Sequence, residues 1–298
     1  MNAERGPIFI GGLAHSGKTQ LRIVLGSHPE ISMTRRTYLW RRYFGRFGDL
    51  GRPRNLDRCL TALSRDEGVR SLAPDVDRVR REFLTGPATY GHLFGLFHQH
   101  HAERLGKRRW GDQLGSVERF ADPIFESFPK ARMIQMIRDP RVAGAVVNGR
   151  RQRPGKVGWE TAIWRRSAEL AERNRRRYAD RYRVVRYENL AAHPEATVRG
   201  VCAFLGEDFL DGMAEALDEV RFDTPAGEGG AGEPRRSPAA FIEGHAKREL
   251  LLLEYPVPAN LAPRGSSSAI GRPIDMAAMA AGRAFGTRHW PSVIGRLR

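Results

Sequence analysis

The chain has 298 residues, of which 41% are hydrophobic, so it is long enough to bury a sizeable core in one α/β domain, with or without an appendage. Lysine and arginine number 50 against 34 acidic residues, for a formal net charge of +16, and only five of the basic residues are lysine. This charge indicates either a compositional bias toward arginine or attraction to a polyanion: a multiply phosphorylated nucleotide, an acidic glycan, a membrane surface or a nucleic acid. No stretch is long and apolar enough to span a membrane, and residues 1–7 lack the apolar core of a secretion signal. We therefore expect a cytoplasmic protein.

The first predicted element is a buried strand over residues 7–11, followed by a glycine-rich loop and a helix. Gly12, Gly17, Lys18 and Thr19 fit the phosphate-loop spacing G-x-x-x-x-G-K-[ST]. Glycines let the backbone curl so that successive N–H groups point inward, and the start of the helix adds its positive end. The pattern predicts an anion-binding loop; the alternative is an ordinary glycine-rich turn between a strand and a helix.

Strand-like and helix-like patterns alternate along the rest of the chain. Two further buried strands are predicted over residues 132–137 and 183–187. Helices are predicted over residues 55–64, 75–84, 90–105, 116–128, 157–181, 194–205 and 241–255. This alternation predicts an α/β fold in three layers, a parallel sheet flanked by helices, with a helical insertion at about 32–128. We expect an α/β domain over residues 1–222, on which a loop and helical extension (223–298) packs.

Three short motifs follow the loop in order. They are Ser27–Ile31 (Ser-His-Pro-Glu-Ile), Arg138–Arg141 (Arg-Asp-Pro-Arg) and Tyr187–Leu190 (Tyr-Glu-Asn-Leu). Together with the loop, they resemble the sulfotransferase family that uses 3′-phosphoadenosine 5′-phosphosulfate (PAPS), over roughly residues 7–210. The resemblance implies a core like that of P-loop nucleotide kinases. It also implies transfer of a sulfuryl group from PAPS to a hydroxyl or amine of a small-molecule, lipid or glycan acceptor.

The resemblance also implies where the donor binds. The loop would hold the 5′-phosphosulfate, Arg138 the 3′-phosphate, for which a guanidinium is well suited, and Tyr187 would lie near the adenine. The donor-binding residues implied in this way are His15, Ser16, Gly17, Lys18, Thr19, Gln20, Arg138 and Tyr187. Each of the last two has a structural alternative: Arg138 could cap the sheet through Asp139, and Tyr187 could be a core aromatic.

Catalysis would then depend on positioning and on charge stabilisation. Lys18 would neutralise charge on the leaving phosphate, and no metal is required because protein cations do this. A base would accept the acceptor's proton. Asp112 is the first candidate, since it lies where relatives place acceptor-site or catalytic groups, and His15 is the second; His28 and Glu30 remain open.

The chain departs from the family at several positions. Relatives have lysine or arginine where this chain has His15, a lysine at Gln113, and a serine at Val146 that binds the 3′-phosphate. The segment 32–38 lacks the glutamate base that many relatives carry there. These departures keep open a non-catalytic nucleotide-binding protein on the same scaffold.

Other interpretations explain less of the sequence. An ATP-dependent P-loop kinase or NTPase fits the intact Gly-Lys-Thr but leaves the later motifs unexplained, and no motif supports nucleic-acid binding. His98 and His101 share a helix face, but no carboxylate or cysteine completes a metal site, so a packing role is favoured. Peripheral membrane contact and homo-oligomerisation stay open. The arginine pairs at 35–36 and 41–42 would face solvent or an acidic acceptor.

Overall fold

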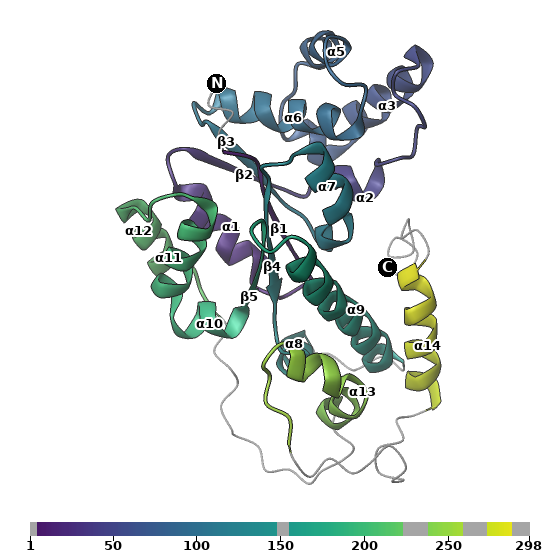
Figure 1. Cartoon of the computed structure of the whole chain (residues 1–298), viewed down its shortest axis with the longest axis vertical. Coiled ribbons are helices and arrows are strands. Elements are labelled where there is room, and N and C mark those ends of the chain that lie inside the picture. Colours follow the sequence, from purple (N-terminus) through teal and green to yellow (C-terminus); the bar gives the residue numbers. More distant parts are fainter. Residues whose placement is uncertain (1–4, 148–154, 223–237, 259–272, 288–298) are drawn as a thin grey trace.

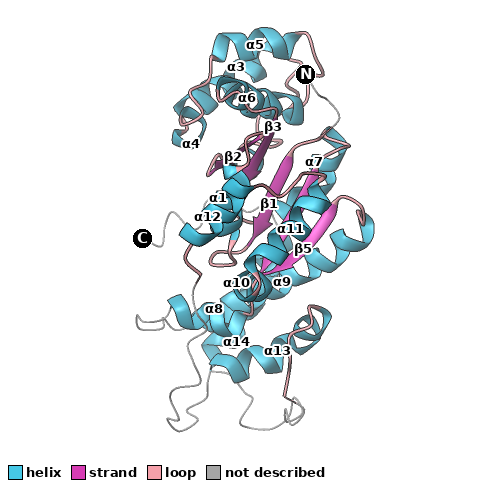
Figure 2. Ribbon diagram, turned by 90° about the vertical axis from the view of Figure 1, so that its left-hand side faces the viewer, coloured by secondary structure: helices cyan, strands magenta, loops and turns pink. Residues whose placement is uncertain are grey.

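The structure, a computed structural model, describes residues 5–147, 155–222, 238–258 and 273–287. Five strands form one parallel sheet in the order β2-β3-β1-β4-β5. They are β1 (Ile8–Gly12), β2 (Ile31–Arg35), β3 (Arg109–Gln113), β4 (Arg132–Ile137) and β5 (Tyr182–Arg186). The predicted α/β fold with a parallel sheet flanked by helices is therefore confirmed (Figures 1 and 2).

Each helix predicted from the sequence has a helical counterpart in the structure, and several short helices were not predicted. The helices are α1 (Lys18–Ser27), α2 (Leu39–Arg42), α3 (Pro53–Arg65), α4 (Glu67–Arg70), α5 (Val76–Leu84), α6 (Tyr90–Arg104), the 3₁₀ helix η1 (Val117–Phe120), α7 (Ala121–Ser127), α8 (Pro140–Val147), α9 (Lys156–Arg177), α10 (Tyr187–Ala192), α11 (Pro194–Leu205), α12 (Asp211–Glu219), α13 (Pro238–Leu252) and α14 (Pro273–Thr287). Figure 1 shows α1 and α10–α12 on one side of the sheet, α7 and α9 on the other, and α3, α5 and α6 beyond its upper end.

The central strand β1 shows why the fold has three layers. Its side chains alternate between the two faces of the sheet, and Ile8, Phe9 and Ile10 are all fully buried. Ile8 and Ile10 pack into the apolar cluster formed with α1, α11 and α12, whereas Phe9 packs into the cluster formed with α2–α7. A strand buried on both faces reads as a continuous apolar run, which is how this one was predicted.

Strands β2 and β3 were not predicted, because their sequences, Ile-Ser-Met-Thr-Arg and Arg-Trp-Gly-Asp-Gln, form no apolar run. Their buried polar side chains instead satisfy each other: Thr34 Oγ1 of β2 donates a hydrogen bond of 3.0 Å to Asp112 Oδ1 of β3. The segment over 32–128 is therefore helical only between and after these two strands.

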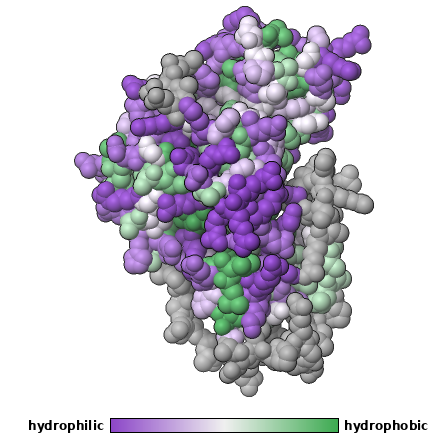
Figure 3. All heavy atoms as spheres, viewed as in Figure 1, coloured by the Kyte–Doolittle hydropathy of each residue, from purple (hydrophilic) through white to green (hydrophobic). Residues whose placement is uncertain are grey.

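The C-terminal helices pack on α9. Leu250 and Ala246 of α13 share a buried cluster with Trp164 of α9, and Gly282 of α14 lies against Trp159 and Ala162 of α9. The loop expected at the start of the 223–298 extension falls outside the described residues over positions 223–237. On the face drawn in Figure 3, hydrophilic side chains predominate and the apolar ones form separate patches. None of the helices described here is both long and apolar enough to cross a membrane.

Candidate active site

The loop between β1 and α1 requires glycine at two positions. Gly12 and Gly17 have φ angles of +116° and +88°. A Cβ on Gly12 would lie 2.1 Å from the carbonyl oxygen of Met136, and one on Gly17 would lie 2.5 Å from Cδ2 of Tyr187. Gly17 is the N-cap of α1, and no side chain in the described part of the chain caps this helix. Its first N–H groups are therefore available to an anion.

Lys18 opens α1 with a buried ammonium group. Its side chain curls back over the loop, where Nζ donates to the carbonyl oxygen of Leu13 and lies 3.5 Å from Ser16 Oγ. Burial lowers the pKa of Lys18 to about 8, although the nearby carboxylate of Glu118 acts in the opposite direction. An anion in the loop would raise this pKa again, so the lysine is suited to binding phosphate.

Glu118, in the 3₁₀ helix η1, holds the backbone at the start of the loop. The sequence did not predict this residue as part of the site. Its carboxylate accepts hydrogen bonds from the backbone N–H of Gly12 (2.9 Å) and from Ser167 Oγ of α9 (3.2 Å). Burial raises the pKa of this carboxyl, while these hydrogen bonds and the charge of Lys18 oppose the rise. No local pattern marks the residue, because its partners lie far from it along the chain.

Arg138 and Tyr187 meet beside the loop. The Arg138 guanidinium lies 4.0 Å from the centre of the Tyr187 ring and donates to the carbonyl oxygen of His15 at 3.2 Å. Both side chains are buried, and Trp164 of α9 fixes the backbone by donating to the carbonyl oxygen of Arg138 at 2.9 Å. A cation–π contact of this kind orients the guanidinium plane.

The carboxylate of Asp139 pairs with the last arginine of the same motif. Arg141 lies 2.6 Å from this carboxylate and also reaches Glu243 of α13 at 2.8 Å. The Arg-Asp-Pro-Arg motif therefore does two things: its first arginine faces the loop, and its last arginine ties the end of β4 to α13.

Asp112 lies behind the site rather than on its surface. Its side chain is fully buried, and its two carboxylate oxygens accept hydrogen bonds from Thr34 (3.0 Å) and Thr37 (2.6 Å). His28 and Glu30 lie beyond the far end of α1, where His28 is the C-cap and Glu30 pairs with Arg108. Of the four candidate bases, His15 is the one that lines the site cavity.

A cavity of about 1360 Å³ joins these parts. Its wall includes the predicted donor-binding residues His15, Ser16, Gly17, Lys18, Thr19, Gln20, Arg138 and Tyr187, as well as Gln113 and Glu118. It lies at the carboxyl ends of the parallel strands, where ligands bind in open α/β sheets. Asp112 does not line it. The side chain of Val146, where relatives carry a serine, lies outside those described.

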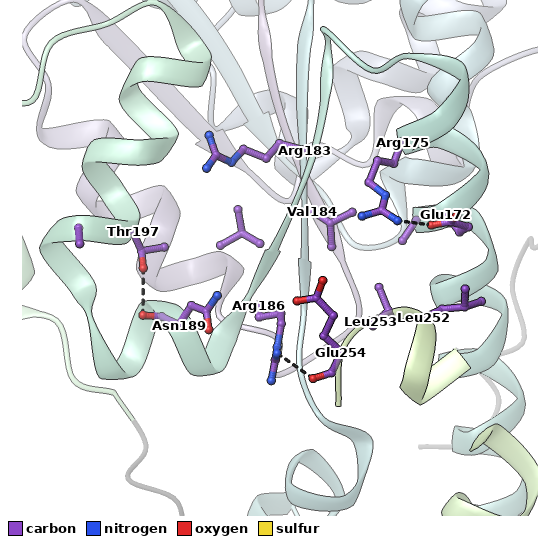
Figure 4. Close-up of a pocket in the computed structure, with 13 residues that line it drawn as sticks. Glu172, Arg175, Arg183, Val184, Arg186, Asn189, Thr197, Leu252, Leu253 and Glu254 are labelled. Atoms are coloured by element: carbon purple, nitrogen blue, oxygen red, sulfur yellow. Dashed lines mark hydrogen bonds and ion pairs between the residues drawn. The ribbon is translucent and has the colours of Figure 1, made fainter. Parts of the chain in front are cut away.

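A second cavity, of about 250 Å³, lies at the outer edge of β5 and shares no residue with the first (Figure 4). Its polar groups largely pair with one another: Arg186 donates to the carbonyl oxygen of Glu254, and Arg175 pairs with Glu172. It contains none of the loop residues and has no predicted site residue in its wall.

The histidines of α6 have structural partners. His98 Nδ1 lies 3.2 Å from Thr34 Oγ1 with its ring stacked on Trp110, and His100 pairs with Glu82 at 2.8 Å. In the resolved part of the chain, no group of three His, Cys, Asp or Glu side chains is placed to hold a metal ion.

Comparison with known proteins agrees with this geometry. In structure the chain is similar to the sulfotransferase domain from the curacin biosynthetic pathway, with a TM-score of 0.51 and 16% identity, covering 85% of this chain and 99% of that one. It is also similar to sulfotransferase STF9 from Mycobacterium avium, with a TM-score of 0.50 and 12% identity, covering 86% of this chain and 79% of that one. A comparison with curated proteins found no match.

A model of the sulfotransferase family matches residues 7–211, which include the phosphate loop, β1–β5 and the motifs after β4 and β5. This match spans more than half of the chain, and it extends over the whole region from which the resemblance was predicted. The chain belongs to the sulfotransferase family.

Proposed function

We propose that this sulfotransferase uses PAPS as its donor and transfers the sulfuryl group to a hydroxyl or amine of a small-molecule, lipid or glycan acceptor. Family membership supports the class of reaction. PAPS is favoured as the donor because the loop, Arg138 and Tyr187 lie side by side in the wall of one cavity.

The residues present fit the donor's charged groups. The N–H groups at the start of α1 and the Lys18 ammonium would hold the 5′-phosphosulfate, where glycines leave the backbone open to close approach. Arg138, whose guanidinium lies beside the loop, would bind the 3′-phosphate. Tyr187, beneath that guanidinium, would border the adenine.

When bound, PAPS supplies an activated sulfuryl group. In the proposed transfer, the acceptor oxygen or nitrogen bonds to sulfur, the bond between sulfur and the 5′-phosphate oxygen breaks, and adenosine 3′,5′-bisphosphate leaves. Lys18 and Arg138, rather than a metal ion, would neutralise the charge on the departing phosphates. His15, exposed on the loop and lining the cavity, would accept the acceptor's proton.

Asp112 would act as a positioning residue. With both oxygens bonded to hydroxyl groups and no exposed surface, it would hold β2 and the segment after it rather than meet the acceptor. Asp112→Asn, which keeps one acceptor oxygen, should retain more transfer activity than Asp112→Ala. This is the result expected if Asp112 acts through its hydrogen bonds with Thr34 and Thr37 and does not accept the acceptor's proton.

The test is a transfer assay with PAPS labelled in its sulfuryl group and a panel of phenols, alcohols, amines and sugars. We expect labelled product that requires no added Mg²⁺ and that is lost in Lys18→Ala, while Lys130→Ala, a change at an exposed lysine outside the cavity, behaves like wild type. Transfer of phosphate from Mg-ATP to the same panel, without use of PAPS, would overturn the proposal.

A further inference from the structure

The cavity wall is strongly cationic. It contains eight arginines and one lysine against two glutamates: Arg35, Arg36, Arg41, Arg42, Arg46, Arg119, Arg138, Arg166 and Lys18 against Glu118 and Glu160. Lys18 and Arg138 belong to the donor site proposed above. Five of the others lie in one stretch, residues 35–46, which runs from the end of β2 through α2 and which we call the arginine segment.

Most charges of the arginine segment lack an acidic partner. Arg42 pairs with Asp66 at 2.7 Å. Over the part of the chain that the structure describes, Arg35, Arg36, Arg41 and Arg46 have no carboxylate within ion-pair distance. Arg41 is half-buried, and both its burial and the charge of Arg42 lower its pKa. Arg35, Arg36 and Arg46 are exposed, and a cluster of cations such as this one attracts an anion.

The backbone holds this segment in a strained shape. Arg36 and Tyr38 have φ angles of 59° and 51°, in the left-handed region that side chains with a Cβ rarely adopt. Thr37, between them, is fully buried and donates a hydrogen bond of 2.6 Å to Asp112. A Cβ on Gly68 would lie 2.1 Å from the carbonyl oxygen of Arg36, so the packing there is tight. Strain that the surroundings enforce is typical of binding sites, because it fixes side chains before the ligand arrives.

Aromatic side chains lie among these arginines. The guanidinium groups of Arg41 and Arg42 lie 4.7 and 4.6 Å from the centre of the Tyr38 ring. Phe44, which is 39% exposed, lines the cavity, and its ring centre lies 5.2 Å from that of Trp40, which is buried in the core. The same wall therefore offers an apolar surface beside its positive charges.

We propose that the acceptor carries an anionic group, a carboxylate or a phosphate ester, which the arginine segment binds, and an apolar part that packs on Tyr38 and Phe44. This inference rests on the proposed function, since it treats the arginine segment as the acceptor's half of a two-ligand cavity. The cavity volume supports two ligands: about 1360 Å³ exceeds the range of roughly 300–1,000 Å³ that is usual for a pocket with one ligand.

The test compares matched acceptors on protein saturated with adenosine 3′,5′-bisphosphate, with binding measured by calorimetry. One pair is 4-hydroxyphenylacetate and its neutral amide; the other is a short-chain monoacylglycerol phosphate and the unphosphorylated monoacylglycerol. We expect at least one anion to bind about tenfold more tightly than its neutral twin, or about 1.4 kcal/mol. The pair that shows this preference distinguishes a carboxylate from a phosphate ester.

Variants locate the effect. Arg41→Gln and, separately, Arg46→Gln should each lower the preference for the anion at least threefold, a loss of about 0.7 kcal/mol. Arg54→Gln, the same charge change at an exposed position of α3 outside the cavity, should leave it unchanged. The inference would be overturned if the neutral compounds bound as tightly as the anions, or if the anions did not bind. Binding of the bisphosphate in the same experiment would still support the proposed function. Failure of the bisphosphate itself to bind would overturn both.

Discussion

The buried ammonium of Lys18 predicts that donor-site affinity depends on pH in a range where the ligand does not titrate. Its pKa is lowered from 10.5 to about 8, chiefly by burial, which corresponds to about 3 kcal/mol against the charged form in the empty site. Phosphate groups lose their second proton near pH 6, so adenosine 3′,5′-bisphosphate is fully ionised above pH 7. Only the protonated lysine attracts it.

The affinity for the bisphosphate should decrease as the pH rises above the pKa of Lys18. Below pH 8 the free protein holds the proton, so affinity is constant; above pH 8 binding must first restore the proton. At pH 9 about one molecule in eleven has a charged Lys18, and the apparent affinity should fall about tenfold relative to pH 7. At pH 8, binding should take up about half a proton, because the bound anion raises the pKa again.

The assay is calorimetric titration with the bisphosphate from pH 6.5 to 9.5, repeated in buffers with different ionisation enthalpies to count protons. Lys18→Gln should bind more weakly at pH 7 and show no proton uptake at pH 8, whereas Lys130→Gln should behave like wild type. An affinity that stays constant from pH 7 to pH 9, without proton uptake, would refute the reasoning.

Two further predictions concern geometry and stability. Gly17→Ala should weaken bisphosphate binding at least tenfold, because the φ of +88° and the Tyr187 ring atom 2.5 Å from the new Cβ force the loop to move. Gly26→Ala, whose Cβ would meet its nearest neighbour at 3.6 Å, should bind the bisphosphate as wild type does. Equal affinities of the two variants in a titration would contradict this prediction. Arg109→Ala should destabilise the protein by about 2–4 kcal/mol in urea unfolding. It removes the arginine 2.8 Å from the carboxylate of Glu207, which is 3% exposed and would keep the exposed Arg5 as a partner, and it also removes hydrogen bonds to the carbonyl oxygens of Gly6 and Leu205. A loss below about 1 kcal/mol would show that the pair contributes little.

The sequence predicted the fold wherever one physical signal was strong. Strands β1 and β4 are buried on both faces and read as apolar runs, and the predicted helices show a helical periodicity of apolar residues or begin at a proline. Strands β2 and β3 gave no such signal, because Thr34 and Asp112 are buried polar residues that satisfy each other across the strands. Such a pair becomes visible only when the two strands are placed side by side.

The site was predicted unevenly for a related reason. The loop residues and Arg138 belong to motifs with fixed spacing, so the resemblance to the sulfotransferase family was enough to predict their position in the site. Glu118 carries no motif, and its support of Gly12 depends on a contact between residues 106 positions apart. Asp112 was predicted near the acceptor, but it is buried and hydrogen-bonded to Thr37. This burial results from tertiary packing, which the spacing of motifs along the sequence cannot predict.

The central claim is that this cavity is built for a nucleotide with a 3′-phosphate, and it is tested most directly by titrating the protein with adenosine 3′,5′-bisphosphate and, separately, with ATP and Mg²⁺. We expect tight binding of the bisphosphate without metal, lost in Arg138→Ala and retained in Arg54→Gln. Preference for Mg-ATP, or no binding of either nucleotide, would contradict it.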